Sequence, residues 1–289
     1  MAAKVWFYAH GEELYIPADK PRDNHMAIYN GGIKGWWGTP DLKVEMTKRE
    51  TGDGDFPISD AAVLYASRIV TLDILVKAPT RQEYRAALEK LNRLSHTEAV
   101  LRVADAQSDT YATGHIRITA DDEQLTSNRC HVTVSATCAD PRRRSWAAHS
   151  GVMIPALASQ GGLIFNAAGI LKTSPISFSG ISTTQNVCTL TNSGTSESYP
   201  VIRASGNLPE GFTITDVGTG RQLSYSHPVA WAPVVLDCLS RTANINGVDV
   251  TRSLTHREWP TIPAGGSITL ALSASGEGHV SAECRDTYI

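Results

Sequence analysis

The chain has 289 residues, enough for two ordinary domains, and a hydrophobic content of 42% allows a full core. The net charge of −3 creates no basic field, so binding to nucleic acid or to an anionic membrane surface is not expected. No apolar run approaches the roughly 20 residues that span a bilayer, and the N-terminus lacks the apolar segment of a signal peptide. We therefore expect assembly in a cytoplasm and no membrane span.

Alternating apolar and polar residues predict strands through most of the N-terminal half. The candidate strands, in chain order, are residues 68–76, 99–105, 111–120 and 130–138. In the first of them, Ile69 and Leu75 indicate some burial of the second face as well. Such short strands are stable only within a sheet, so the N-terminal half is expected to close as one β-domain.

Helical spacing replaces this alternation at about residues 81–95. The apolar side chains on the predicted stripe are Tyr84, Leu88, Leu91 and Leu94. Thr80 and Glu83, just before and within the segment, have the spacing of a capping box. We expect one amphipathic helix that buries its stripe against a sheet face.

The composition then changes, and prolines and a glycine pair enclose a polar stretch followed by small residues. We interpret this stretch as an interdomain linker that lies across the N-terminal domain through Trp146 and Met153. The predicted organisation is an N-terminal β-domain (1–140), the linker (141–162) and a C-terminal domain (163–289).

Short strands with turn signals between them recur through the C-terminal domain, which is the rhythm of a β-sandwich. The candidates are residues 175–180, 186–194, 199–206, 211–220, 232–238, 243–251, 267–273 and 279–284. Asn246-Gly247 and residues 218–220 are predicted hairpin turns. The fold class expected for the whole chain is therefore mainly β, with one α-helix.

A Trp-Pro corner precedes the last long strand of this domain. Pro260 and Pro263 lack a backbone donor and cannot continue a ladder, and the glycine pair at Gly265 permits the positive φ of a tight turn. We expect Trp259 to cap the end of the sandwich core, at a point where the chain crosses between the two sheets.

Motifs for catalysis are absent from the sequence: it has no nucleophile elbow, zinc helix or phosphate loop. The five cysteines are an odd and widely spaced set, which favours reduced, buried thiols over disulfides or a zinc site. Asp53, Asp55 and Asp60 offer oxygen ligands for calcium, but Asp and Gly also suit a tight exposed turn, which we favour. We expect no catalytic residue, metal or cofactor, and no enzymatic activity.

Two groups of residues are candidate binding sites, and each also has a purely structural interpretation. The run Arg142, Arg143 and Arg144 is either a solvated face or a protein interface, where arginine is enriched. Trp231 and Trp259 either plug the core or stack on a sugar, as aromatic side chains do in β-sandwich lectins.

An ordered series of short motifs runs through the chain. In the C-terminal half it comprises Tyr199-Pro200, Asp237, Arg241, Asn246-Gly247, Leu254, Trp259-Pro260, Pro263, Gly265, Arg285 and Tyr288. A less specific series in the N-terminal half comprises Gly32, Gly35-Trp36, Asp53-Gly54, Arg68 and Asp73, followed by the predicted helix. In this order the motifs resemble those of the distal tail protein family of long-tailed phages, except that Cys284 stands where that family often has an aromatic residue.

The resemblance implies a structural virion protein: a minor tail protein of the baseplate or tail tip, assembled in the host cytoplasm. The implied fold is an N-terminal ring-forming β-domain with one helix, followed by a galectin-like or carbohydrate-binding-module-like β-sandwich. The implied assembly is a homo-oligomeric, hexameric ring that joins the tail tube to the tail-tip hub. The implied partners are the tail tube, tape measure and tail-tip hub proteins and receptor-binding or fibre proteins. The alternative function is a carbohydrate-binding module of the tail that contacts the host cell surface.

Overall fold

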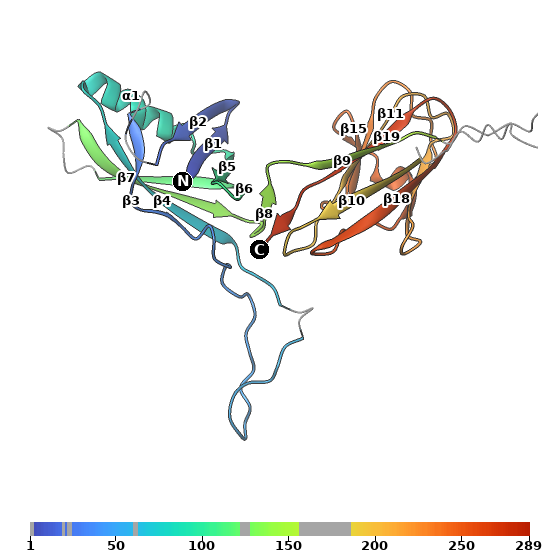
Figure 1. Ribbon diagram of the computed structural model, residues 1–289, viewed down its shortest axis with the longest axis horizontal. Coiled ribbons are helices and arrows are strands. Elements are labelled where there is room, and N and C mark those ends of the chain that lie inside the picture. Colours follow the sequence, from blue (N-terminus) through green and yellow to red (C-terminus); the bar gives the residue numbers. More distant parts are fainter. Residues whose placement is uncertain (1–2, 19–20, 22–24, 60–62, 122–127, 156–185) are drawn as a thin grey trace, which may run out of the picture. The chain divides into compact units, whose positions relative to one another are not determined.

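The structure is a computed structural model, which describes residues 3–18, 21, 25–59, 63–121, 128–155 and 186–289. The chain divides into two compact units, and both are built mainly of β-strands, as predicted (Figure 1). Unit 1 comprises Met1–Ala147 and Tyr288–Ile289, and unit 2 comprises Ala148–Thr287. The predicted strand at 175–180 and the predicted start of the C-terminal domain at 163 lie outside the described residues.

Unit 1 is built on a nine-stranded sheet. Seven of its strands follow the order β2-β1-β5-β6-β7-β4-β3, and the other two are β8, which pairs with β6, and β20, which pairs with β8. Its strands are β1 (Lys4–Ala9), β2 (Glu12–Ile16), β3 (Met26–Lys34), β4 (Arg68–Lys77), β5 (Glu98–Ala104), β6 (Asp109–Ala120), β7 (Arg129–Cys138), β8 (Arg143–Ser145) and β20 (Thr287–Tyr288). All four strands predicted for this half are confirmed as β4 to β7. Alternate residues of each of these strands point into the core, so one face of the sheet is apolar. The side chains of the opposite face do not contribute to this core.

The predicted helix is confirmed as α1 (Arg81–Asn92) and lies on the core side of the sheet (Figure 1). Its capping box is present, because Thr80 Oγ1 accepts the amide of Glu83 at 3.3 Å and the Glu83 carboxylate accepts the amide of Thr80 at 3.2 Å. Tyr84 and Leu91 are buried in the core of unit 1, as the stripe predicted.

Two short strands occupy the described part of the stretch interpreted as a linker. One is β8, in the sheet of unit 1, and the other is β9 (His149–Met153), which pairs with β19 in unit 2. Trp146 stacks on Tyr8 of unit 1 with ring centroids 5.4 Å apart. Met153, in contrast to our expectation, is fully buried in the core of unit 2. Strands of three and five residues have too little alternation to stand out in the sequence, which is why the pattern favoured a linker.

Unit 2 is a β-sandwich of two antiparallel sheets, in the orders β10-β18-β12-β13-β17 and β16-β15-β14-β11-β19-β9. Its further elements are β10 (Val187–Asn192), β11 (Val201–Ser205), β12 (Phe212–Asp216), β13 (Gln222–Tyr225), β14 (Val234–Asp237), β15 (Thr242–Ile245), β16 (Val248–Asp249), the 3-10 helix η3 (Thr251–Ser253), β17 (Leu254–Arg257), β18 (Gly266–Ala274) and β19 (His279–Cys284). Each predicted strand within the described residues is present, and the Asn246-Gly247 turn joins β15 to β16 with positive φ at both residues.

The Trp-Pro corner joins two strands of the same sheet, β17 and β18, so the expected crossing between sheets is wrong. Trp259 is half-buried and packs against the core of unit 2, as expected, and Gly265 has a φ of +63°. Between them, Ile262 bridges to Ser198, a residue of the loop that follows β10. The corner is therefore held by this loop and not by the opposite sheet.

All five cysteines are buried and none forms a disulfide, as the sequence predicted. Burial raises the pKa of Cys138 and of Cys284 to about 11, and it also raises the pKa of Cys188 and Cys238.

We expect the native protein to be almost inert to a thiol reagent at about pH 8, because all five thiols are buried and, at Cys138 and Cys284, a pKa near 11 leaves only about one thiol in a thousand ionised. Absorbance after addition of a disulfide reagent measures this, with the protein unfolded in guanidinium as the control that releases five equivalents. Fast stoichiometric reaction of the native protein would contradict the buried positions.

Candidate interaction surfaces

Large aromatic side chains gather on the face of the unit 1 sheet that points away from the core. The aromatic patch consists of Trp6, Tyr8, Arg102, Tyr111 and Trp146. The guanidinium carbon of Arg102 lies 4.8 Å from the ring centroid of Trp6 and 4.2 Å from that of Trp146. Trp146 also packs edge-on against Tyr111, with centroids 5.7 Å apart. The side chains thus order one another before any partner arrives.

The charge of Arg102 is neutralised within the patch. Asp109 accepts two hydrogen bonds from its guanidinium, at 2.8 and 2.6 Å, and this pairing raises the pKa of Arg102. Trp, Tyr and Arg are the residue types enriched at the centres of protein interfaces. The aromatic patch is therefore suited to contact a largely uncharged protein surface.

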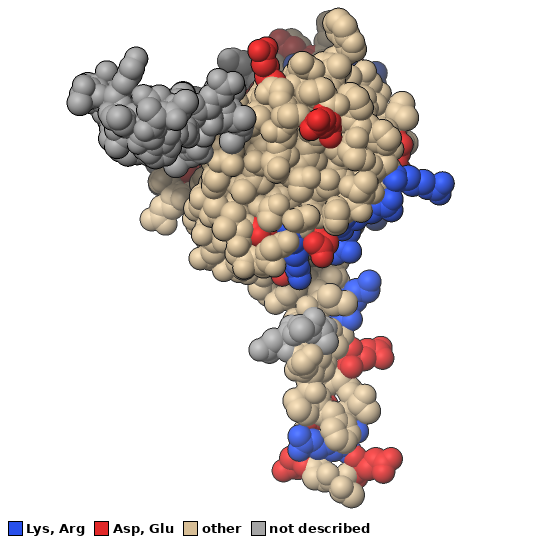
Figure 2. Space-filling view, turned by 90° about the vertical axis from the view of Figure 1, so that its right-hand side faces the viewer, with Lys and Arg blue, Asp and Glu red and all other residues tan. Residues whose placement is uncertain are grey.

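A long arm, residues 39–67, leaves the sheet of unit 1 between β3 and β4 (Figure 1). In its described residues, isolated bridges at Leu42–Tyr65 and Lys48–Asp55 hold the two sides together. Four apolar side chains of the arm are more than half exposed: Leu42, Met46, Phe56 and Leu64. Figure 2 shows acidic and basic side chains interspersed along the arm. On the face of unit 2 that is visible in this view, charged side chains are few. Exposed apolar side chains on a thin arm are typical of a binding element.

The candidate calcium ligands lie in this arm. Asp53 and Asp55 lie in a turn in which Gly52 and Gly54 have positive φ. Asp60 lies outside the described residues. Within the described part of the chain, no group of three or more His, Cys, Asp or Glu is placed to hold a metal ion.

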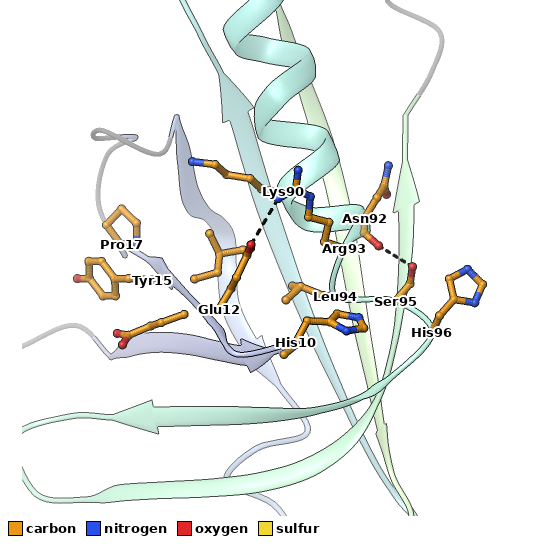
Figure 3. A pocket seen from close by; sticks show the side chains of 13 residues that line it. His10, Glu12, Tyr15, Pro17, Lys90, Asn92, Arg93, Leu94, Ser95 and His96 are labelled. Carbon is orange, nitrogen blue, oxygen red and sulfur yellow. Dashed lines mark hydrogen bonds and ion pairs between the residues drawn. The ribbon is translucent and has the colours of Figure 1, made fainter.

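A groove of about 930 Å³ lies between the β1–β2 hairpin and the C-terminal end of α1 (Figure 3). Leu14 and Leu94 are among its apolar lining residues, and the ion pair between Arg93 and Glu12, at 3.5 Å, spans it. Among the described residues, neither of its histidines, His10 or His96, forms an ion pair with a carboxylate. The groove offers a strand edge and mixed charges but no arrangement for acid–base or covalent catalysis.

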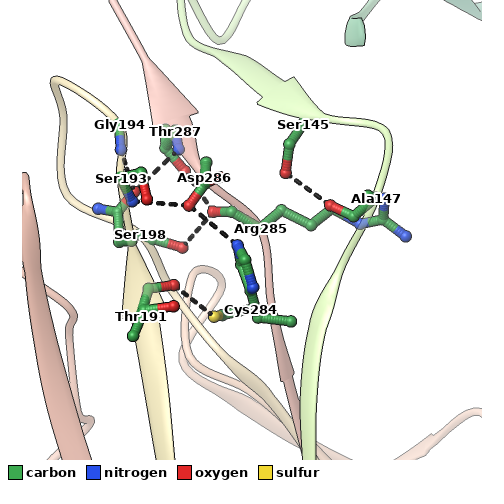
Figure 4. A network of polar contacts seen from close by, with 12 residues as sticks. Ser145, Ala147, Thr191, Ser193, Gly194, Ser198, Cys284, Arg285, Asp286 and Thr287 are labelled. Atoms are coloured by element: carbon green, nitrogen blue, oxygen red, sulfur yellow. Dashed lines mark hydrogen bonds and ion pairs between the residues drawn. The ribbon is translucent and has the colours of Figure 1, made fainter. Parts of the chain in front are cut away.

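A polar network fastens the last strands of unit 2 to the loop that follows β10 (Figure 4). Asp286 accepts the amide of Ser193 at 2.7 Å, and its carboxylate lies 3.2 Å from His149 Nε2. Ser198 donates its hydroxyl to the carbonyl of Arg285 at 2.7 Å. The network is a structural tie, since each of its polar groups is turned toward another part of the unit.

The arginine run separates into two kinds of residue. Arg142 Nε and Arg144 Nη2 both bind the carboxylate of Asp140, at 3.1 and 2.7 Å. Arg143, between them, points the other way and is only 9% exposed, with its guanidinium carbon 5.8 Å from the Trp36 ring centroid and 5.7 Å from that of Trp37. Strand geometry in β8 accounts for this split, because successive side chains point to opposite faces.

The two candidate sugar-stacking residues are not brought together. Trp231 is fully exposed in the loop before β14, whereas Trp259 is half-buried against the core. Among the described residues no ring contact joins them. Of the two, Trp231 presents the more exposed ring face.

No helix in the described residues is long and apolar enough to cross a membrane. The architecture is a β-domain with one helix and an arm, followed by a two-sheet sandwich from which the chain returns to the first sheet through β20.

Solved structures that are similar to this chain include a phage adsorption-apparatus protein and phage baseplate proteins. The crystal structure of the SPP1 Dit (gp 19.1) protein, described as a paradigm of the hub adsorption apparatus in phages infecting Gram-positive hosts, matches with a TM-score of 0.61 and 14% identity over 100% of both chains. Two structures of the phage P2 baseplate in its activated conformation also match. The one with Ca has a TM-score of 0.56 at 8% identity, covering 99% of this chain and 98% of the other. The one with Sr has a TM-score of 0.57 at 7% identity, covering 98% of each chain.

No protein-family model matches the sequence, and neither does any curated protein sequence. The protein therefore has the fold of a phage distal tail or baseplate protein. At these identities the likeness concerns the fold, and function requires a separate argument.

Proposed function

We propose that this chain is a structural subunit of the tail tip of a long-tailed phage, where it forms a hexameric ring that joins the tail tube to the tail-tip hub and receptor-binding apparatus. The observation that carries the proposal is the match to SPP1 Dit along the full length of both chains, which includes both units in the same order. The motif series in the sequence points to the same family independently of the coordinates.

In this proposal unit 1 forms the ring and unit 2 lies on its periphery. A closed ring uses heterologous contacts, in which one face of a subunit meets a different face of the next. Unit 1 offers two dissimilar surfaces of this kind, the aromatic patch and the arm with its exposed apolar side chains. The tail tube, tape measure and hub proteins would contact the ring, and receptor-binding or fibre proteins would dock at its edge. The subunit would be made in the host cytoplasm and would act without catalysis.

Light scattering of the purified full-length chain, with electron microscopy of the same sample, tests ring formation. Immunogold labelling of phage particles with an antibody against the chain tests its location. We expect label at the distal end of the tail. Particles that carry the chain elsewhere, or not at all, would contradict the proposal, whereas a monomer in solution alone would show only that closure needs the tail tube or hub.

The second candidate function is a carbohydrate-binding module, and the complete exposure of Trp231 is the observation that favours it. An exposed indole provides the flat apolar face on which a sugar ring stacks.

If unit 2 binds a glycan through Trp231, Trp231→Ala should weaken binding about two- to tenfold, since an aromatic contact contributes about 0.5–1.5 kcal/mol. A glycan array followed by calorimetry on the full chain measures this effect. Leu239→Ala, which shortens another exposed apolar side chain of unit 2, is the matched control. Unchanged binding in Trp231→Ala would remove the stacking hypothesis. Trp231→Ala should in any case leave thermal unfolding unchanged, because the side chain has no buried surface to lose.

A further inference from the structure

Buried donors without acceptors gather around β8 in unit 1. In the described part of the chain, four buried side-chain polar atoms have no hydrogen-bond partner: Trp36 Nε1, Arg68 Nη2, Thr110 Oγ1 and Arg143 Nε. Arg143 belongs to β8, and Thr110 pairs in register with Ser145 of the same strand. Such atoms are rare in folded proteins because each costs its full desolvation energy, so a cluster of them requires an explanation.

Three of these donors belong to one cluster. Arg143 packs over Trp36, whose carbonyl accepts a hydrogen bond from Arg68 at 3.0 Å. Arg68 and Arg143 also lie close enough for their charges to interact, because Arg68 contributes to lowering the pKa of Arg143, after the larger effect of burial. We call Trp36, Arg68 and Arg143, with Trp37 at the rim, the β8 cluster.

Among the described residues, the β8 cluster holds two positive charges and no carboxylate, and the acidic group that acts on Arg143 is the weakly acidic phenol of Tyr288. Arg68 donates to four backbone carbonyls, which are neutral, and Arg143 makes no ion pair or hydrogen bond with any described residue. The nearest carboxylate in the sequence, that of Asp140, is already shared by Arg142 and Arg144. Two buried guanidinium groups side by side repel each other unless an anion lies near them.

The cluster reaches the protein surface at two side chains. Arg143 keeps 9% of its surface exposed, and Trp37, which packs on the same guanidinium, is 48% exposed. A guanidinium group presents paired N–H donors in a planar fork, and the complementary acceptor is the planar carboxylate. Aromatic rings on both sides of the fork would hold it in place and exclude water from the contact.

We propose that the β8 cluster is a binding site for a carboxylate, which pairs with the guanidinium of Arg143 and compensates the charge of Arg68. The proposal does not rest on the proposed function of the chain. The carboxylate comes either from a small organic acid in solution or from an Asp or Glu side chain of another protein molecule, and the two sources give different results in the experiment below.

The experiment is thermal unfolding of the full-length chain near neutral pH, in sodium acetate up to about 100 mM and in sodium chloride of equal ionic strength. We expect acetate to raise the Tm saturably by about 2–4 °C beyond chloride, because an anion that binds only the folded state stabilises it. Arg143→Gln should abolish this rise. Arg144→Gln, which makes the same change of charge on the same strand but at a residue paired with Asp140, should retain it.

Light scattering of the same variants tests the second source of the carboxylate, an Asp or Glu side chain of another protein molecule. If a second protein chain supplies the carboxylate, acetate has little effect on Tm, but Arg143→Gln weakens self-assembly or binding to phage tail components about tenfold and Arg144→Gln does not. Should Arg143→Gln fail to fold, Arg143→Lys keeps the charge without the planar fork and should lose at least half of either effect.

Three results would overturn the proposal. One is that acetate and chloride act alike on the wild-type protein while the assembly of Arg143→Gln is unchanged, in which case water alone satisfies the donors. Another is that Arg143→Gln keeps the full acetate effect, which places binding elsewhere. The third is that Arg144→Gln loses the effect as well, which makes it a general response to charge.

Discussion

Replacing Arg68 with Met is expected to lower the free energy of unfolding of unit 1 by about 3–5 kcal/mol. The side chain is 1% exposed and donates to four carbonyl oxygens. These belong to Pro141 at 2.7 Å, Gly35 at 2.8 Å, Trp36 at 3.0 Å and Gly38 at 2.7 Å. Methionine fills much of the same volume but leaves all four acceptors without a donor in a buried place.

The position of these carbonyls shows what Arg68 holds together. Gly35, Trp36 and Gly38 form the turn at which the chain leaves β3 to enter the arm, and Gly35 lies so close to β4 that a Cβ atom there would meet the carbonyl oxygen of Ile69. Loss of the guanidinium should therefore loosen the root of the arm as well as destabilise the sheet.

Hydrogen exchange measured by mass spectrometry in increasing denaturant tests this prediction, because it reports on the two units separately. Peptides from β4 and β7 should lose protection in Arg68→Met while peptides from unit 2 do not. Arg68→Lys should recover less than half of the loss, since an ammonium group lacks the planar fork. Arg85→Met, which removes an exposed arginine from α1, should change stability by less than about 0.5 kcal/mol. Equal effects of the two Met variants would refute the role given to Arg68.

Arg68 lies on the face of its strand that the alternation predicts to be buried, but a charged residue type gives no reason to expect burial. It begins a strand in which alternate residues are predicted to be buried, and Val70 and Leu72 follow that prediction. The acceptors of Arg68, however, lie about 30 and 73 residues away along the chain, so only the folded structure brings them to it. The same pattern suggested some burial for Ile69, which is 60% exposed, because an apolar residue on the outer face looks the same in sequence as one that packs.

The β1–β2 hairpin was within reach of sequence reasoning but was not predicted. Two short runs of strand-forming residues flank His10-Gly11, which closes the hairpin with φ of 51° and 76°. Trp6 and Tyr8 hide the alternation, since they are large aromatic residues on the face opposite the core. The aromatic patch was missed for a different reason: its members come from segments that are separated in sequence.

The candidate sites show how far residue type alone can lead. In sequence the arginine run was either a solvated face or an interface, and only the structure separates Arg143 from the two neighbours that share Asp140. The two tryptophans shared the same two alternative interpretations in sequence, whereas in the structure Trp231 is fully exposed and Trp259 packs against the core. In both cases the decisive quantity is the direction of a side chain, which composition and spacing do not contain.

Asn192→Ala is expected to destabilise unit 2 by about 2–4 kcal/mol, because the side chain organises the end of the sandwich from a position that is 1% exposed. Its Nδ2 donates to the carbonyls of Ser196 at 2.8 Å and Pro263 at 3.1 Å. Its Oδ1 accepts the amides of Gly194 at 3.0 Å and Thr287 at 3.1 Å. One amide group thus ties the loop after β10 to the Trp-Pro corner and to the segment that enters β20.

The variants that follow from this geometry distinguish packing from hydrogen bonding. Asn192→Leu keeps the volume without the hydrogen bonds and should be at least as unstable as Asn192→Ala, since the backbone groups that Asn192 pairs lose this partner in either case. Asn207→Ala, at an exposed asparagine of the same unit, should change stability by less than about 0.5 kcal/mol. In hydrogen exchange, peptides that cover the corner and the C-terminal segment should lose protection together, and before the central strands of the sandwich. If the corner keeps its protection when Asn192 is replaced, then Pro260, Pro263 and Gly265 are sufficient to fix it, and the tie through Asn192 is dispensable.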